Sequence, residues 1–173
     1  MATVTFKNDI VCNLAGNEIN VGDAAPVVTV VNCDPMLQDE TIGGASDKAQ
    51  LVIVVPSLDT PVCDAETRKF NTEVASIDGI SVKTVSMDLP FAAAKFCSTA
   101  GIDNLDVCSD FRNKDFANAY GMLLADGPLA GLTCRAIFVI DKSGNVCYKE
   151  LVPEITAEPN YEAALEAAKS VAS

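Results

Sequence analysis

The apolar run Leu51–Val55 constrains the fold more strongly than any other feature of this chain. Five consecutive apolar residues rich in valine predict a strand that is buried on both faces, as in parallel sheets covered by helices. The run is followed by Pro56, and the segment 64–76 a little further on carries apolar residues at the three-to-four spacing of a helix. A buried strand that continues into a helix indicates an α/β fold.

The remaining segments extend this pattern. Strands are expected at 27–31, 80–86, 135–140 and 146–151, and helices at 91–99, 114–120 and 160–171. The segment 34–50, which contains Gly43 and Gly44, is expected to be a loop with one short strand. A β-α-β unit followed by a β-hairpin and a C-terminal helix is the thioredoxin-like plan, in which helices flank a central mixed sheet.

The length of 173 residues predicts a single thioredoxin-like domain over 1–173. Its opening residues, 1–22, are expected to form an added N-terminal β-hairpin. The alternation of apolar and polar residues predicts a first strand there, followed by a turn at Asn13–Asn17 and a second strand at Glu18–Val21.

The charge balance argues against two classes of partner. The net charge of −12 disfavours nucleic acid and anionic membrane surfaces, because both require basic protein surface. The N-terminus lacks the basic and apolar regions of a secretory signal, and the longest apolar runs are too short to span a bilayer. We therefore expect a cytoplasmic location, with no nucleic-acid and no membrane partner.

The chain has no histidine and seven cysteines. The absence of histidine excludes Ser-His-Asp and Cys-His catalysis and histidine-ligated metal sites. No two cysteines have the Cys-x-x-Cys spacing of zinc knuckles and dithiol redox motifs, and an odd number is not typical of a disulfide scaffold. We expect neither a metal nor another cofactor, so a reactive cysteine must be activated by cations, hydroxyls or helix N–H groups.

Cys63 occupies the place where the buried strand turns into the helix. The first N–H groups of a helix are unpaired and carry partial positive charge, which favours a thiolate over a thiol. Thr60, three residues earlier, can offer a hydroxyl to the sulfur or to the molecule that it attacks. A cysteine is more often a small buried apolar residue than a nucleophile, but this setting indicates a nucleophile.

A cation is expected beside this sulfur, because helix N–H groups contribute only about 1–2 kcal/mol to a thiolate. The chain has three arginines. Arg68 can reach back along its helix or face solvent, and Arg112 lies in a polar loop typical of the surface. Arg135 begins an apolar strand, where a charge is costly unless it is used. We therefore expect the guanidinium of Arg135, with its permanent charge and several donors, next to Cys63.

Cys97 lies near the end of the predicted helix 91–99. It is a core cysteine, one end of a structural disulfide, or the residue that resolves a Cys63 sulfenic acid into a reversible disulfide. A cytosolic protein rarely keeps a structural disulfide, so the reversible one is favoured. Cys108, expected in an exposed loop, is a second candidate for the resolving thiol. The remaining cysteines are interpreted as structural: Cys12, Cys33, Cys134 and Cys147.

Several motifs make the chain resemble the peroxiredoxins, and specifically their bacterial thiol peroxidase subfamily. Pro56, Thr60 and Cys63 match the peroxiredoxin signature Pro-x-x-x-Thr/Ser-x-x-Cys. Segments similar to the subfamily follow in order along the chain at 87–97, 115–121, 125–132, 135–136 and 151–155.

This resemblance implies a peroxiredoxin fold and an antioxidant activity that reduces alkyl hydroperoxides and hydrogen peroxide, with thioredoxin as the reductant. It implies that Cys63 is the peroxidatic cysteine and that Cys97 of the same chain resolves it through a Cys63–Cys97 disulfide. Thr60 and Arg135 complete the implied active site, and Pro56 shields the sulfur. A homodimer with its interface near the peroxidatic site is also implied.

Two other classes remain open. A thiol–disulfide oxidoreductase shares the fold, but the missing Cys-x-x-Cys argues against it. A redox sensor or binding module would oxidise at Cys63 without rapid turnover, and the combination of Cys63, Thr60 and Arg135 argues against that.

Overall fold

The computed structural model describes residues 2–172, and a seven-stranded mixed sheet forms its centre. The strands of this sheet are β3 (Val28–Cys33), β4 (Met36–Ile42), β5 (Ala49–Val54), β6 (Ile80–Ser86), β7 (Asp106–Ser109), β9 (Ala136–Ile140) and β10 (Val146–Leu151). Across the sheet they are ordered β10-β9-β5-β6-β7-β3-β4. A smaller sheet contains β1 (Thr3–Phe6), β2 (Ile10–Ala15) and β8 (Leu123–Leu124).

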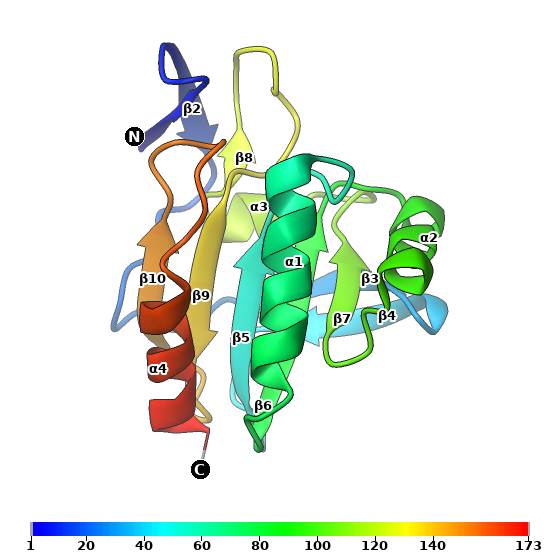
Figure 1. Cartoon of the computed structure of the whole chain (residues 1–173). Coiled ribbons are helices and arrows are strands. Elements are labelled where there is room, and N and C mark those ends of the chain that lie inside the picture. Colours follow the sequence, from blue (N-terminus) through cyan, green and yellow to red (C-terminus); the bar gives the residue numbers. More distant parts are fainter. Residues whose placement is uncertain (1, 173) are drawn as a thin grey trace.

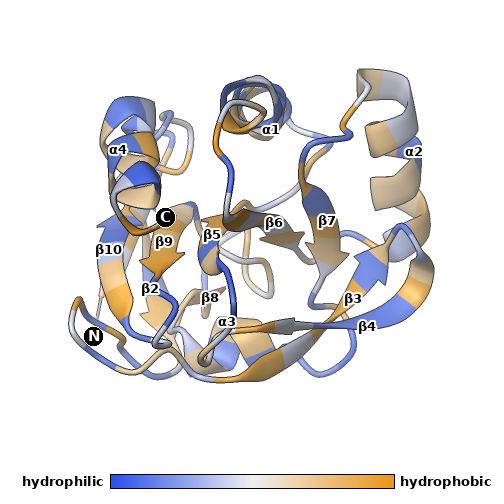
Figure 2. Cartoon of the chain, turned by 90° about the horizontal axis from the view of Figure 1, so that it is seen from below, coloured by the Kyte–Doolittle hydropathy of each residue, from blue (hydrophilic) through white to orange (hydrophobic). Residues whose placement is uncertain are grey.

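Helices cover both faces of the central sheet. They are α1 (Pro61–Val74), α2 (Pro90–Ala100), α3 (Asp115–Ala119) and α4 (Tyr161–Val171). Helices α1, α2 and α4 lie side by side on one face, whereas α3 and the smaller sheet lie on the other (Figures 1 and 2). None of the helices within residues 2–172 is long and apolar enough to cross a membrane.

Strand β5 is the central strand that the apolar run predicts. It pairs in parallel with β6 and antiparallel with β9, and all six of its residues are buried. Its side chains alternate between two cores. Leu51 and Ile53 pack in the core beneath α1, α2 and α4, and Val52 and Val54 pack in the core on the opposite face. Because both faces are covered, the strand has no polar alternation, and its end leads through the loop 55–60 to α1.

The predicted thioredoxin-like fold class is confirmed, with a β5-α1-β6 unit, a β9-β10 hairpin and a C-terminal helix. The single domain over 1–173 stays a prediction, and its end residues, 1 and 173, lie outside the described part of the chain. The expected short strand within 34–50 is the seven-residue β4, and the sequence analysis missed β7 and β8. Both missed strands are short, at four and two residues.

The N-terminal hairpin is present, but the predicted position of its turn is wrong. The turn spans Lys7–Asp9, where Lys7 and Asn8 adopt φ of 54° and 67°. Asn13, expected in the turn, lies in β2, where its backbone N–H and side-chain amide donate to Asp126 at 2.8 and 2.6 Å. The predicted second strand, Glu18–Val21, is irregular. Asparagine tolerates positive φ, and asparagine occurs both in the observed turn, at Asn8, and at the two ends of the predicted turn, at Asn13 and Asn17.

Candidate active site

Cys63 lies in the first turn of α1, as the third residue of the helix, and its side chain is fully buried. Thr60 is the N-cap residue with extended backbone, and Pro61 opens the helix, where its missing N–H costs no hydrogen bond. The helix begins three residues earlier than the predicted start at 64. Cys63 thus belongs to the first turn of a helix, the end where the helix dipole favours negative charge.

Arg135 brings a permanent positive charge to this sulfur. Its Nη2 donates a hydrogen bond to Cys63 Sγ at 3.2 Å, and the side chain is only 2% exposed. Out of contact with water, a hydrogen bond between a guanidinium and a thiolate is stronger than the same contact at the surface. The structure therefore places the one arginine of the apolar strand region beside Cys63.

The main chain around Ile155 holds Arg135 in place. Arg135 Nε donates to the carbonyl of Ile155 at 2.9 Å, and the Arg135 carbonyl accepts from the N–H of Val152 at 3.0 Å. The same segment meets the N-terminal hairpin. Thr5 N–H donates to the Pro153 carbonyl, and Ile155 N–H donates to the Thr5 carbonyl, both at 2.8 Å.

Glu66 is a third member of the site, which the sequence analysis missed. Its Oε2 accepts a hydrogen bond from Arg135 Nη1, and its side chain is fully buried. Its other oxygen, Oε1, has no hydrogen-bond partner within residues 2–172. Burial raises the pKa of Glu66 to about 7, and the charge of Arg135 opposes this rise. Because Glu66 is one helical turn from Cys63, the i, i+3 spacing was the available signal.

The charges of the site also act on Arg135. Burial alone would lower the pKa of its guanidinium, but the neighbouring Glu66 carboxyl and Cys63 sulfur raise it above its ordinary value. Arg135 therefore stays charged and can serve two partners at once. Its Nη2 donates to the Cys63 sulfur, and its Nη1 donates to the Glu66 carboxylate.

Pro56 and Thr60 both precede Cys63 in the chain, and neither forms a hydrogen bond with its sulfur. Thr60 is exposed, and its hydroxyl donates to the carbonyl of Ser57 at 2.8 Å rather than to Cys63. Pro56 is buried directly after β5. Because the Thr60 hydroxyl already donates its hydrogen to the Ser57 carbonyl, its oxygen can only accept a hydrogen bond from another group.

Asp88 ties the loop before α1 to the start of α2. Its carboxylate accepts from Ser57 Oγ and from the Leu58 N–H, both at 2.7 Å, and from Ser86 Oγ at 2.9 Å. These bonds connect the end of β6 with the loop that precedes Cys63. This role of Asp88 leaves no local signal in the sequence, because the contacts span 30 and 31 residues.

Cys97 is half-buried on α2 and does not bond Cys63. Helix α2 packs against β3, β4 and β7, and Cys97 packs against the core that contains Cys33. A cavity of about 450 Å³ lies between α1 and α2. Its lining includes Asp64, next to Cys63, and Phe96, next to Cys97. The structure therefore holds the two candidate redox cysteines on separate helices as thiols.

The other candidates lie elsewhere. The Arg68 guanidinium, half-exposed, pairs with Asp64 and lies 5.9 Å from the ring centroid of Phe96. Arg112 is on the surface, 3.6 Å from Asp39. The expectation that Cys108 is exposed in a loop is wrong. Cys108 is fully buried in β7, and this burial raises its pKa above the ordinary value.

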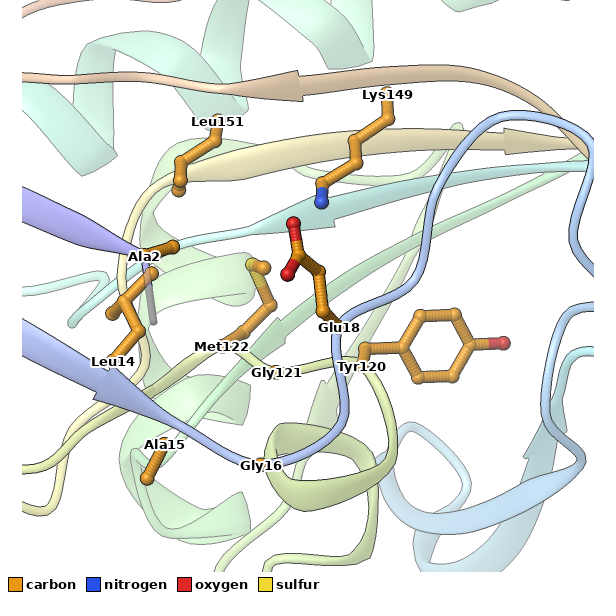
Figure 3. A pocket seen from close by; sticks show the side chains of 10 residues that line it. All are labelled: Ala2, Leu14, Ala15, Gly16, Glu18, Tyr120, Gly121, Met122, Lys149 and Leu151. Carbon is orange, nitrogen blue, oxygen red and sulfur yellow. The ribbon is translucent and has the colours of Figure 1, made fainter.

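A second cavity, of about 400 Å³, lies between the N-terminal hairpin region and β10 (Figure 3). Glu18 and Lys149 point toward one another inside it, and the Lys149 ammonium also donates to the Ile19 carbonyl at 2.7 Å. None of the five predicted site residues lines this cavity. Cys63 and Cys97 pack in the core on the other face of the sheet.

Comparison with known proteins agrees with this arrangement. A family model described as Redoxin matches residues 20–165. The chain belongs to the redoxin family. The match covers all the elements that carry the site, from β3 to the start of α4.

Known proteins similar to this redoxin include two described as thiol peroxidases. The one from Aquifex aeolicus (strain VF5) is 50% identical over 169 residues, which cover 98% of each chain. The one from Campylobacter jejuni is 51% identical over 160 residues, covering 92% of this chain and 89% of the relative. A solved structure described as a peroxiredoxin-like protein from Aquifex aeolicus has a TM-score of 0.94 at 48% identity, covering 99% of this chain and 98% of that one. The resemblance seen in the sequence is thus confirmed.

Proposed function

We propose that this redoxin is an antioxidant thiol peroxidase that reduces alkyl hydroperoxides and hydrogen peroxide, with Cys63 as the peroxidatic cysteine. The observation that carries the proposal is the buried contact of 3.2 Å between Cys63 Sγ and Arg135 Nη2 at the start of α1. A cysteine used only for packing has no need of a buried guanidinium. The descriptions of the relatives as thiol peroxidases support the same activity.

In the first step, the Cys63 thiolate attacks the terminal oxygen of the hydroperoxide in line with the O–O bond. Arg135 and the first-turn N–H groups stabilise the charge that develops on the leaving oxygen. The exposed Thr60 oxygen, which already donates to Ser57, accepts the hydrogen of the hydroperoxide. Pro56 shields the sulfur from solvent. The leaving oxygen takes from solvent the proton that the Cys63 thiol had released there, departs as water or an alcohol, and Cys63 becomes a sulfenic acid.

In the second step, the Cys97 thiol attacks this sulfenic acid, a Cys63–Cys97 disulfide forms, and water leaves. A disulfide needs Cα atoms within about 7 Å of each other. Because α1 and α2 are separated by a cavity, the first turn of α1 and the end of α2 have to unwind locally. Cys97 also has to leave the core beneath α1, α2 and α4, against which it packs.

The proposal extends to the partners of the enzyme. Thioredoxin reopens the disulfide by thiol–disulfide exchange. All seven cysteines are free thiols, which fits the reducing cytoplasm. Leu89 and Phe91, at the start of α2, are 54% and 62% exposed. Such exposed apolar side chains close to the site support a homodimer whose interface includes the start of α2.

Stopped-flow mixing of the reduced protein with substoichiometric cumene hydroperoxide tests the function. We expect rapid peroxide consumption and a Cys63–Cys97 bond in peptide maps of the first product. Cys63→Ser should lose all consumption, and Cys97→Ser should consume one equivalent but lose thioredoxin-coupled turnover. Cys147→Ser is the matched control, since Cys147 is half-buried and donates only to the Val139 carbonyl at 3.4 Å.

The outcomes separate the rival classes. Slow peroxide consumption together with fast reduction of protein disulfides would assign the chain to the thiol–disulfide oxidoreductases. Oxidation of Cys63 without turnover would favour a redox sensor. Full turnover in Cys63→Ser would show that Cys63 is not the residue that attacks the peroxide.

A further inference from the structure

The orientation of the Arg135 guanidinium depends on an acceptor in the main chain. The guanidinium is planar and rigid, so fixing the direction of one N–H group fixes the others. Its donors reach Cys63 Sγ at 3.2 Å, the Glu66 carboxylate, and the Ile155 carbonyl at 2.9 Å. Cys63 and Glu66 both belong to α1, whereas Ile155 is an anchor outside that helix. A displacement of the Ile155 carbonyl therefore turns the donor that faces the sulfur.

Ile155 lies in the segment 152–160, which connects β10 to α4. Apart from an isolated bridge between Thr5 and Glu154, this segment forms neither helix nor strand. The Ile155 side chain is buried in the core. Connecting segments without regular hydrogen bonding are more mobile than the elements that they join. The position of the Ile155 carbonyl therefore also depends on the contacts that fix the neighbouring backbone.

Glu154 precedes Ile155, and its carboxylate connects the residue after Ile155 to the N-terminal hairpin. It accepts hydrogen bonds from the N–H of Thr156 at 2.9 Å and from the Thr156 hydroxyl. On the hairpin, it accepts from the Thr5 hydroxyl at 2.6 Å and from the backbone N–H groups of residues 7 and 8 at 3.1 and 2.9 Å. One half-buried carboxylate thus fixes the backbone on both sides of Ile155 to β1 and its turn.

The hairpin turn and the pKa of Glu154 both favour an ionised carboxylate at this position. Lys7 and Asn8 have φ of 54° and 67°, and successive N–H groups of such a turn form a concave site for an anion. Burial raises the pKa of Glu154, but hydrogen bonds from Thr156 and Thr5 outweigh burial and hold this pKa at about 2. Hydrogen bonds to an ionised carboxylate are stronger than those to a neutral acceptor. The contact is therefore maintained at neutral pH.

We propose that Glu154 is a positioning residue for the reaction of Cys63 with peroxide. Its carboxylate fixes the Ile155 carbonyl, and this carbonyl orients the Arg135 guanidinium toward the sulfur. The inference rests on the proposed peroxidase function, because the guanidinium has to be oriented only if Cys63 attacks a peroxide. It gives the N-terminal hairpin a role in the reaction, although the hairpin itself does not contact Cys63.

Glu154→Gln in the full-length reduced protein tests this inference. Glutamine has nearly the same volume, but it keeps one acceptor oxygen and turns an NH₂ group toward donors that the carboxylate now accepts from. We expect stopped-flow consumption of substoichiometric cumene hydroperoxide to slow about tenfold, because small displacements of a catalytic group are costly. Hydrogen exchange at the Ile155 N–H, which donates to the Thr5 carbonyl at 2.8 Å, should become faster.

Matched variants control for the substitution itself. Glu162→Gln changes an acidic residue that is exposed in the first turn of α4, and it should react as the wild type does. Thr5→Val removes a hydroxyl that donates to the Glu154 carboxylate, and it should slow the same step about threefold. Thr5→Ser keeps the hydroxyl and should restore the rate. If Glu154→Gln fails to fold, the comparison of Thr5→Val with Thr5→Ser decides.

A double-mutant cycle separates positioning of Arg135 from a general loosening of the fold. Lysine at position 135 keeps the charge, but its single ammonium group cannot donate to the Ile155 carbonyl from the place of Nε while it also faces Cys63. The connection from Glu154 to the sulfur is then interrupted. In the Arg135→Lys background, Glu154→Gln should therefore change the rate of the peroxide step by less than about twofold.

Specific results would overturn the inference. An unchanged peroxide step in Glu154→Gln would refute it and leave the peroxidase function intact. A tenfold loss that persists in the Arg135→Lys background would show that Glu154 does not act through Arg135. Equal rates in Thr5→Val and Thr5→Ser would remove the Thr5 hydroxyl from the connection. Absence of peroxide consumption in the wild type would reject the proposed function, and the positioning role with it.

Discussion

Replacing Glu66 by glutamine measures whether burial or the ion pair with Arg135 dominates the energetics of this carboxyl. Burial raises the pKa of Glu66 from 4.5 to about 7, although Arg135 opposes the rise. A carboxyl with a higher pKa in the folded than in the unfolded chain binds its proton more tightly when folded. Its contribution to stability is therefore fully present below pH 4.5 and is lost as the pH rises through about 7.

The magnitude follows from the two pKa values. Their difference corresponds to about 3 kcal/mol, of which about 2–3 kcal/mol is lost between pH 5 and pH 8. Glutamine has nearly the same volume and keeps one oxygen to accept from Arg135 Nη1, but it cannot ionise. Groups that titrate alike in both proteins cancel when the two are compared. The free energy of unfolding of the wild type minus that of Glu66→Gln should therefore fall by about 2–3 kcal/mol over this range.

Urea unfolding of the reduced proteins at several pH values, with linear extrapolation to water, gives these free energies. Glu73→Gln, an exposed position on the same helix, controls for the amide substitution itself. A difference that stays constant with pH would refute the reasoning. A difference that rises with pH would show that the attraction to Arg135 outweighs the cost of burial.

Three further predictions concern the surroundings of Cys63. Arg135→Lys should slow the first peroxide step about 10- to 100-fold in stopped-flow, because the variant loses a charge-assisted hydrogen bond worth about 1.5–3 kcal/mol. An unchanged rate of this step would contradict the role of Arg135 in activating Cys63. Thr60→Val should slow the same step about tenfold and Thr60→Ser should restore it, whereas equal rates in both would remove the hydroxyl from the mechanism. Asp88→Asn should lower the free energy of unfolding by about 1–2 kcal/mol and speed hydrogen exchange at the Leu58 N–H; unaltered exchange there would mean that the loop is held by other contacts.

Several parts of the structure could be predicted because local signals and tertiary needs agree there. The apolar run of β5 has no stable position except between two covered faces. The helix α2 ends at Gly101, whose left-handed conformation with φ of 69° is the conformation that favours glycine at a helix end. The placement of Arg135 followed from the cost of a charge at the start of an apolar strand, since a group of that kind is kept only where a partner exists.

The features that escaped prediction depend on contacts between distant segments. Glu66 has the same local pattern as a solvent-facing glutamate of an amphipathic helix, and only Arg135, 69 residues later, makes its burial possible. The packing of Cys33 and Cys97 in one core likewise depends on the way α2 crosses β3, which no local pattern encodes. The error about Cys108 has the same origin, because β7 is a four-residue strand that gains its burial entirely from its neighbours.

The contact of Thr5 with the segment around Ile155 has a practical consequence for handling the protein. The same Ile155 whose N–H bonds Thr5 offers its carbonyl to Arg135 Nε, so two hydrogen bonds separate the first strand from the guanidinium beside Cys63. An affinity tag or fusion partner at the N-terminus is attached next to that strand, whereas one at the C-terminus follows α4. Recombinant protein intended for kinetic work is therefore better tagged after α4, and an N-terminal tag is better cleaved before peroxide rates are compared.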